Sequence, residues 1–230
     1  MRILPLLGLF NYSLCRGYSH LMMRPADISI PVLSQRDTVL RELKTEDAPS
    51  FYSLIDRNRN SLRDWLFWVD LTNAEKDSFD FIVNSRQQRR EGNALVLGLF
   101  HEGKVSGTVS LVSIDHAKST AELGYWIAPS FEGRGLVTSS CLALMGYGFD
   151  TLGLDEIYAR AVTKNTKSVN VFSRIGLLSQ AQDKEQQYYK GTNIEFDMTK
   201  GIMTKDNWLK LKDSEQAALL DGSKKAKLTK

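Results

Sequence analysis

The sequence has few of the residues that form disulfides or bind metals. Its 230 residues include two cysteines, Cys15 and Cys141, and three histidines, His20, His101 and His116. Two cysteines so far apart in the chain exclude a disulfide scaffold and a cysteine zinc cluster, and the histidines lack the spacing of metal ligands. We therefore expect a protein without a metal.

Long apolar runs and low-complexity segments are absent as well. With 5 prolines and 16 glycines the chain is neither collagen-like nor rich in Pro and Gly, whereas 42% hydrophobic residues suffice for one sizeable core. The apolar run at residues 3–10 is too short to cross a bilayer. These properties predict one globular domain and no membrane partner.

Positive charge is concentrated at the two ends of the chain. Of the net charge of +3, residues 1–37 contribute +2 and residues 209–230 contribute +3, which leaves −2 for residues 38–208. A mildly acidic body does not favour a nucleic-acid partner.

Both termini are expected to lie outside the folded domain. Residues 1–26 contain arginines, serines and tyrosines but no acid, a composition typical of a mitochondrial or plastid transit peptide. Three alternatives stay open: a secretory signal, a true start at Met22 or Met23, and an uncleaved disordered arm. Without a transit peptide we expect a cytoplasmic protein. Residues 209–230 are expected to form a basic, flexible tail.

The hydrophobic pattern predicts a mixed α+β domain. Before residue 94 apolar residues recur at helical spacing, and Phe79, Ile82 and Val83 would form the buried stripe of one helix. From residue 94 the period is often two, so successive strands should be antiparallel neighbours. The expected strands are 39–43, 94–100, 105–114, 120–127, 157–162, 178–189 and 194–200, and the expected helical regions lie near 45–55, 61–68, 79–90, 142–149 and 165–176.

A glycine-containing loop, Glu132-Gly133-Arg134-Gly135-Leu136, lies between an expected strand and an expected helix. Glycines let backbone N–H groups approach a ligand closely, the helix N-terminus adds a positive dipole end, and Arg134 adds a charge. A ligand that carries a pyrophosphate fits this chemistry. The loop has neither the Walker nor the Rossmann spacing, and an ordinary tight turn is the alternative.

Further blocks occur in order along residues 38–208. They are RDWLFWVD at 63–70, AELGYWI at 121–127, GRG at 133–135, NTKS at 165–168, RIGL at 174–177 and the closing segment 189–208. Together they resemble the GNAT acetyltransferase superfamily and, within it, the RimJ/RimL-like branch of ribosomal-protein N-terminal acetyltransferases.

The resemblance implies the GNAT fold for residues 38–208. This is an α/β/α layered α+β domain with a central mixed, mostly antiparallel sheet, splayed at the acetyl-CoA site and flanked by helices. It also implies acetyl-CoA as the cosubstrate. The residues expected to bind it are Trp126, Ile127, Ala128, Gly133, Arg134, Gly135, Leu136, Val137, Thr138, Asn165 and Ser168.

The chain departs from the family pattern at four positions. The family loop is usually Q/R-x-x-G-x-G/A, but here Glu132 occupies the first place and Val137 the last. An acid at 132 is unfavourable for a phosphate. Phe172 occupies the position of a tyrosine that serves as general acid in many members, and Leu177 replaces a phenylalanine.

The resemblance implies direct acetyl transfer to an amine in a ternary complex. The amine must be neutral to attack, and an N-terminal amine has a pKa of about 7.7–8.0 compared with about 10.4 for lysine, so a carboxylate acting through water would suffice as the base. Glu122 is the first candidate, with a structural ion pair to an arginine as its alternative. Glu185 is the second, and Gln187 shares its strand face.

Other roles follow from the same resemblance. Ser168 is expected to protonate the departing thiolate or to hold the CoA sulfur, unless it is only a first-turn helix residue. A backbone N–H between Trp126 and Ala128 is expected to stabilise the oxyanion. Three aromatic residues are expected either to wall the acceptor pocket or to form a small core cluster: Trp65, Phe67 and Trp68.

The sequence therefore predicts an acetyl-CoA-dependent N-acetyltransferase that acts on a protein or peptide N-terminal amine. One alternative acceptor is a small-molecule amine such as a polyamine, amino acid or antibiotic. Another alternative is a CoA-binding module without turnover. The expected partners are acetyl-CoA and the amine, and both a monomer and a homodimer stay open.

Overall fold

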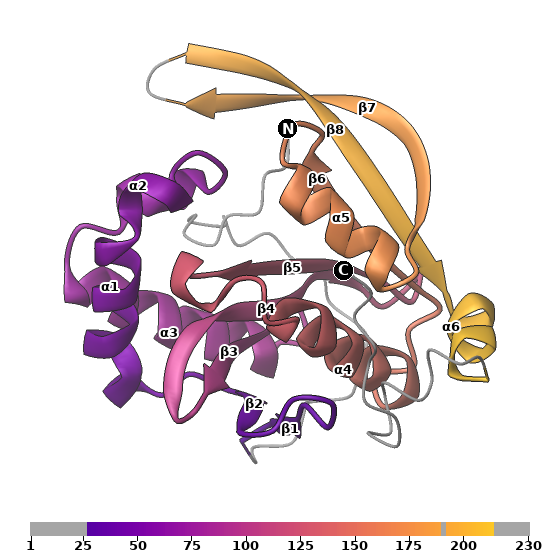
Figure 1. Cartoon of the computed structure of the whole chain (residues 1–230), viewed down its shortest axis with the longest axis horizontal. Helices are drawn as coiled ribbons and strands as arrows, with labels where there is room; N and C mark the ends of the chain where they lie inside the picture. Colours follow the sequence, from indigo (N-terminus) through magenta and orange to yellow (C-terminus); the bar gives the residue numbers. More distant parts are fainter. Residues whose placement is uncertain (1–26, 190–191, 214–230) are drawn as a thin grey trace.

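The computed structural model describes residues 27–189 and 192–213 (Figure 1). The strands are β1 (Ser29–Pro31), β2 (Thr38–Arg41), β3 (Leu95–His101), β4 (Lys104–Asp115), β5 (Thr120–Ile127), β6 (Glu156–Val162), β7 (Leu178–Tyr189) and β8 (Thr192–Thr204). The helices are η1 (Thr45–Asp47), α1 (Ala48–Arg57), α2 (Arg59–Leu62), η2 (Phe67–Leu71), α3 (Glu75–Arg90), η3 (Pro129–Phe131), α4 (Leu136–Asp150), α5 (Thr166–Arg174) and α6 (Lys205–Lys212).

The eight strands of the described residues belong to one sheet in the order β1-β2-β3-β4-β5-β6-β8-β7. β5 and β6 pair in parallel, and the other neighbours pair antiparallel. The predicted α+β architecture with a mixed, mostly antiparallel sheet is therefore confirmed.

Helices cover both faces of the sheet (Figure 1). Side chains alternate along β3 because successive residues of a strand point to opposite faces. Leu95, Leu97 and Leu99 are buried in the same cluster as α4 and α5, whereas Val96 and Phe100 are buried in the cluster that contains α1 and α3. The two faces thus have separate cores, and β5 contributes to both.

Two short elements carry no clear pattern in the sequence. β1 has three residues, too few for a periodicity. In α6 the Thr204 hydroxyl accepts a hydrogen bond from the Asn207 N–H (3.3 Å), and the buried Trp208 ring stacks on Phe149 with 5.5 Å between centroids. This cap and this contact extend the fold to Lys212, four residues into the segment predicted to be a flexible tail.

The predicted buried stripe of α3 is wrong. Phe79 and Val83 are 42% and 46% exposed, whereas Ile82 is buried. Ser78, Ser85 and Arg89 contribute to the buried face. The rotation of this helix depends on buried polar residues, which an apolar periodicity cannot locate.

Arg89 forms a fully buried ion pair with Glu42, with 2.8 Å between Nε and Oε1 and side-chain exposures of 4% and 3%. We expect Arg89→Met to lower the free energy of unfolding by about 3–5 kcal/mol, because removal of one partner leaves a buried charge uncompensated. Urea denaturation measures this change. Lys76→Met, which breaks the exposed pair with Asp80, should cost much less, because solvent screens that pair; equal costs would show that burial does not matter here.

Two regions of the sequence prediction lie outside the described residues. These are the segment 1–26 and the tail from 214 onward, so the predicted targeting segment is not tested. In the part of the chain that is described, none of the helices has both the length and the apolar character needed to cross a membrane.

Cys141 is completely buried, and burial raises the pKa of its thiol. It is a core residue.

Candidate active site

The sheet opens between β5 and β6. These strands pair only over Thr120–Glu122 and Glu156–Tyr158. Beyond that point β5 continues along β4, and β6 continues along β8. The edge of β5 that faces β6 has no strand partner there among the described residues, and α5 lies over this opening (Figure 1).

Backbone groups of β5 point alternately at β4 and at the opening. The Ala128 N–H donates to the Ser106 carbonyl (2.8 Å), so the Trp126 N–H also points toward β4. The N–H groups of Tyr125 and Ile127 consequently face the opening. Three residues, 126–128, were predicted to supply a backbone N–H to the oxyanion. Among them, only the N–H of Ile127 points toward the opening.

Gly107, which no sequence motif singled out, pairs with Ile127 where β4 runs beside this end of β5. A Cβ at Gly107 would lie 2.1 Å from the Trp126 carbonyl oxygen, so a side chain would displace the backbone. We expect Gly107→Ala to lower the free energy of unfolding by about 1–3 kcal/mol, measured by urea denaturation. In the control Gly124→Ala the new Cβ would approach only the Ser110 hydroxyl, at 3.0 Å, and a smaller loss is expected; an equal loss would contradict the steric argument.

The predicted glycine loop leads directly into α4. Gly133 and Gly135 both have φ of 75°, in the left-handed region that favours glycine. The first bond of the helix runs from the Ser139 N–H to the Gly135 carbonyl (3.0 Å). This leaves the N–H groups of residues 136–138 without helical acceptors, and no side chain of the described residues caps this end.

This loop end fits a phosphate group. Three N–H groups and the positive end of a 15-residue helix point outward. A Cβ at Gly133 would meet no atom of the described residues within 4 Å, so they leave the approach open. Behind the loop, the Gln35 amide donates to the Arg134 carbonyl (3.2 Å) and holds the loop in place.

Ser168 and Tyr125 join α5 to β5 at the opening. The Ser168 hydroxyl donates to the Tyr125 hydroxyl (3.0 Å), which in turn donates to the Ser168 carbonyl (2.9 Å). Burial raises the pKa of Tyr125, so its phenol stays neutral. Asn165 caps the helix by accepting from the Ser168 N–H (3.2 Å), and Phe172 is buried in the core.

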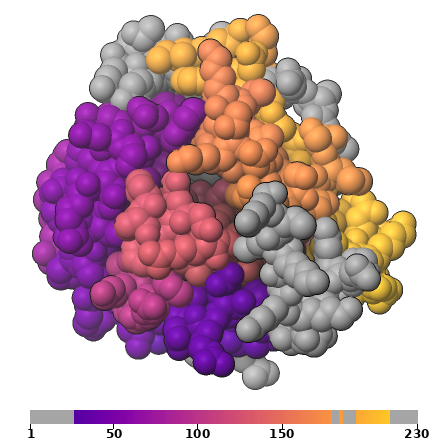
Figure 2. All heavy atoms as spheres, viewed as in Figure 1, coloured from indigo at the N-terminus to yellow at the C-terminus, as the bar shows by residue number. Residues whose placement is uncertain are grey.

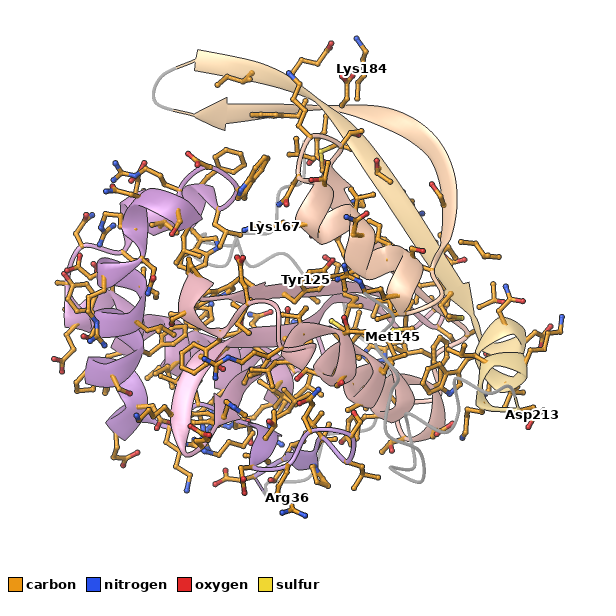
Figure 3. The ribbon with its side chains drawn as sticks, viewed as in Figure 1. Arg36, Tyr125, Met145, Lys167, Lys184 and Asp213 are labelled. Carbon is orange, nitrogen blue, oxygen red and sulfur yellow. The ribbon has the colours of Figure 1, made fainter. Side chains whose placement is uncertain are left out.

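The acid at 132 has a counter-ion that the sequence analysis missed. Lys167 Nζ, in the first turn of α5, lies 2.6 Å from Glu132 Oε2. Figure 3 shows Lys167 projecting beside the opening, near Tyr125. In the space-filling view the surface is hollowed between the loop region and α5 (Figure 2).

Both candidate bases contact one arginine on the opposite face of the sheet. Arg160, on β6, donates from Nε and Nη2 to the two carboxylate oxygens of Glu122, each at 3.1 Å, and from Nη1 to Glu185 Oε2 at 2.9 Å. Glu122 therefore forms an ion pair with an arginine, which is the structural alternative to its predicted role as the base. Burial, followed by the Glu122 carboxylate, raises the pKa of the neighbouring Tyr158.

The predicted aromatic residues divide between two environments. Trp68 packs against Trp126 with 5.7 Å between ring centroids, and Phe67 against Phe196 of β8 with 5.9 Å. Trp65 is 40% exposed. Because Trp126 and Glu122 share a face of β5, these rings lie on the same side of the sheet as the two carboxylates.

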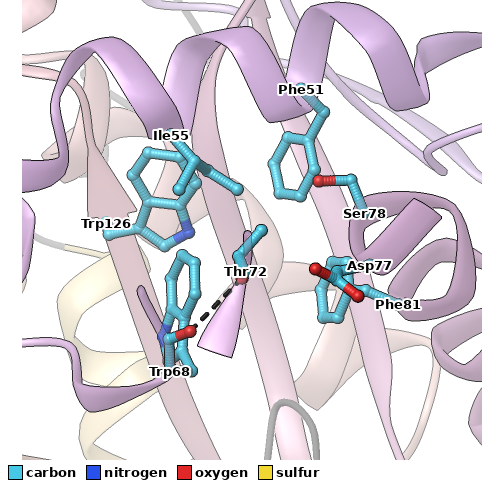
Figure 4. Close-up of a pocket in the computed structure, with 8 residues that line it drawn as sticks. All are labelled: Phe51, Ile55, Trp68, Thr72, Asp77, Ser78, Phe81 and Trp126. Atoms are coloured by element: carbon cyan, nitrogen blue, oxygen red, sulfur yellow. Dashed lines mark hydrogen bonds between the residues drawn. The ribbon is translucent and has the colours of Figure 1, made fainter. Parts of the chain in front are cut away.

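A small cavity lies beside Trp68 and Trp126 (Figure 4). Its volume is about 10 Å³, room for one water molecule and not for an amine substrate. It is lined by Phe51, Ile55, Trp68, Thr72, Asp77, Ser78, Phe81 and Trp126. The acceptor therefore has no preformed enclosed pocket at this cluster.

The structure brings most of the predicted residues to the two sides of one opening. The loop and Ser168 lie on the α4 and α5 side, whereas Glu122 and Glu185 lie on the other. The Trp126 side chain packs away from the loop, so only its backbone borders the cofactor side. The side chain of Gln187 lies outside the described residues. The residues that the sequence did not reveal are Gly107, Tyr125, Arg160 and Lys167. For Arg160 a local signal exists, because Tyr158 and Arg160 alternate with buried apolar residues along β6.

A loop whose geometry fits a phosphate, beside an opened parallel strand pair, suits an enzyme that takes an acyl group from CoA. A family model described as "Acetyltransferase (GNAT) domain" matches residues 37–178. The chain belongs to this family and is an acetyl-CoA-dependent N-acetyltransferase.

Two curated relatives differ in their acceptors. The chain is 32% identical over 170 residues to "Putative ribosomal N-acetyltransferase YdaF" of Bacillus subtilis (strain 168), covering 74% of this chain and 92% of the relative. This similarity supports the RimJ/RimL-like branch. The chain is also 26% identical over 163 residues to Spermidine N(1)-acetyltransferase of Escherichia coli (strain K12), covering 69% and 82%.

A solved structure with a bound cosubstrate is also similar. The crystal structure of Microcin C7 self immunity acetyltransferase MccE in complex with acetyl-CoA and AMP has a TM-score of 0.68 and 25% identity, covering 74% of this chain and 94% of MccE. A relative with this fold thus binds acetyl-CoA.

Proposed function

We propose that the protein acetylates the N-terminal amine of a protein or peptide. The observation that carries this proposal is the opening between β5 and β6, which links a phosphate-binding loop on one face of the sheet to two carboxylates on the other. A cosubstrate held by the loop would present its acyl end to an amine on the carboxylate side.

The chain's own groups would hold acetyl-CoA along this opening. Bound acetyl-CoA supplies the acetyl group as a reactive thioester. The N–H groups at the start of α4 suit its phosphates, and the β5 edge at Tyr125 suits an amide of its pantetheine arm. The Ile127 N–H is the donor we assign to the charge that develops on the acetyl oxygen.

Glu185 is the proposed general base. Glu122 uses both carboxylate oxygens on Arg160, so that its charge is committed to a bidentate ion pair. Glu185 receives a hydrogen bond from Arg160 Nη1 through Oε2. We assign to Glu185 the removal of the amine proton through water, and to Glu122 and Arg160 the positioning of Glu185.

Ser168 is the proposed proton donor to the departing sulfur. Its hydroxyl lies at the opening and is hydrogen-bonded to the neutral phenol of Tyr125. The Tyr125 hydroxyl contacts Ser168 and could return a proton to the Ser168 oxygen. Phe172 has no hydroxyl and cannot do this. Tyr125 is thus the phenol available at this site.

Charge and space favour a peptide end over a polyamine. Two carboxylates and one guanidinium leave one net negative charge beside the opening, which matches one ammonium group. The cavity at the aromatic cluster is too small to enclose a substrate. A small-molecule amine is the second candidate acceptor, because one relative is a spermidine acetyltransferase.

The acceptor is tested by comparing kcat/KM for peptides with free N-termini, the same peptides with blocked N-termini and an internal lysine, and spermidine. We expect turnover of the free N-termini at least about tenfold above the other two classes. Faster turnover of spermidine would replace the proposed acceptor by a polyamine.

A further inference from the structure

We propose that Lys167 binds a phosphate of CoA and that Glu132 competes with that phosphate for Lys167, so that Glu132 lowers the affinity for the cofactor and speeds its release. This inference rests on the proposed function, because it concerns the same cofactor site. It assigns a role to the acid that replaces the usual Gln or Arg of the loop.

The position of Lys167 is unfavourable for its own helix. It is the second residue of α5, where the helix dipole presents positive charge. A cation there is repelled by the positive end of the helix dipole, so the helix itself gives no reason for a lysine at this position. In the free protein the anion beside Lys167 is Glu132, with 2.6 Å between Nζ and Oε2.

The pair also bridges the two sides of the cofactor entrance. Glu132 precedes the α4 N-terminus and Lys167 lies in the first turn of α5, 35 residues further along the chain. The phosphate-binding N–H groups of residues 136–138 start four residues after Glu132. A phosphate bound there would lie within the reach of the long Lys167 side chain.

The pair is weak enough to exchange partners. The Lys167 side chain is 79% exposed and that of Glu132 is 36% exposed. Ion pairs in such positions contribute little because solvent screens them. A phosphate of higher charge can displace the carboxylate, and the carboxylate can recover Lys167 when CoA leaves.

Calorimetric titration of CoA into the full chain and its variants tests this exchange. We expect Lys167→Gln to raise the Kd about three- to tenfold and Glu132→Gln to lower it by a similar factor, with slower CoA release in stopped flow. In the Lys167→Gln background the gain from Glu132→Gln should shrink about threefold, because no ion pair remains to be broken.

The decisive comparison is the coupling between the two substitutions. Equal gains from Glu132→Gln in both backgrounds, or an unchanged Kd in Lys167→Gln, would overturn the inference. Acetyl-pantetheine, which lacks the nucleotide phosphates, should bind all variants alike. If it follows the same pattern as CoA, the effect is not one of phosphate binding.

A matched pair controls for general surface charge. Lys118 and Asp115 have side-chain exposures of 76% and 37%, nearly those of Lys167 and Glu132, but lie in the turn at the other end of β5. Lys118→Gln and Asp115→Asn should leave the Kd of CoA unchanged. Failure of the unmodified protein to bind CoA at all would instead contradict the proposed function.

Discussion

Replacement of Gly135 by aspartate is expected to raise the Kd of acetyl-CoA at least about 100-fold. Gly135 has φ of 75°, and a Cβ there would lie 3.2 Å from the Gln35 amide nitrogen that holds the loop. The new carboxylate would also stand at the α4 N-terminus, the proposed site of the phosphates, and would repel them. Calorimetric titration measures the effect.

Gly103→Asp is the matched control for this change. Gly103 has φ of 74° in the turn between β3 and β4, and a Cβ there meets no atom within 4 Å. Both variants carry the same backbone strain and the same added charge. Only Gly135→Asp should lose binding. A comparable loss in Gly103→Asp would mean that strain, and not the phosphate site, is responsible.

Glu185→Gln is expected to lower kcat about 10²–10³-fold with an unchanged Kd for CoA. Glutamine keeps the size of the side chain but cannot take up the amine proton, and general bases contribute about 10²–10⁴-fold. Steady-state kinetics with a peptide acceptor and titration with CoA separate the two quantities.

Two further variants serve as controls for Glu185→Gln. Glu195→Gln changes the same charge on the neighbouring strand β8, at an exposed pair with Lys184, and should leave kcat unchanged. Glu122→Gln should mainly reduce stability, because it leaves Arg160 without its bidentate partner. A larger loss of kcat in Glu122→Gln than in Glu185→Gln, in a stably folded protein, would return the role of base to Glu122.

Local patterns were sufficient to predict most of the fold. Period-two alternation located β3 to β5, and the block AELGYWI together with the glycine loop located the end of β5 and the loop that leads into α4. Short or polar features were not predictable in this way. The three residues of β1 and the rotation of α3, set by buried Arg89, depend on contacts between distant parts of the chain.

The site was predicted less completely than the fold. The sequence proposed Glu122 and Glu185 separately, but it could not show that Arg160 contacts both, since that depends on the register of β5, β6, β8 and β7. It identified Glu132 as a departure but not Lys167 as its partner, because 35 residues separate them. Long-range side-chain pairs of this kind leave no local pattern.

The central claim is that the opening between β5 and β6 holds acetyl-CoA and directs its acetyl group to an amine. Thiol release from acetyl-CoA by the full chain, with a panel of N-terminal peptides, amino acids and polyamines, tests it most directly. We expect release that requires an amine and is lost in Gly135→Asp but not in Gly103→Asp. Binding of acetyl-CoA without release for any amine would contradict it and would identify a CoA-binding module instead.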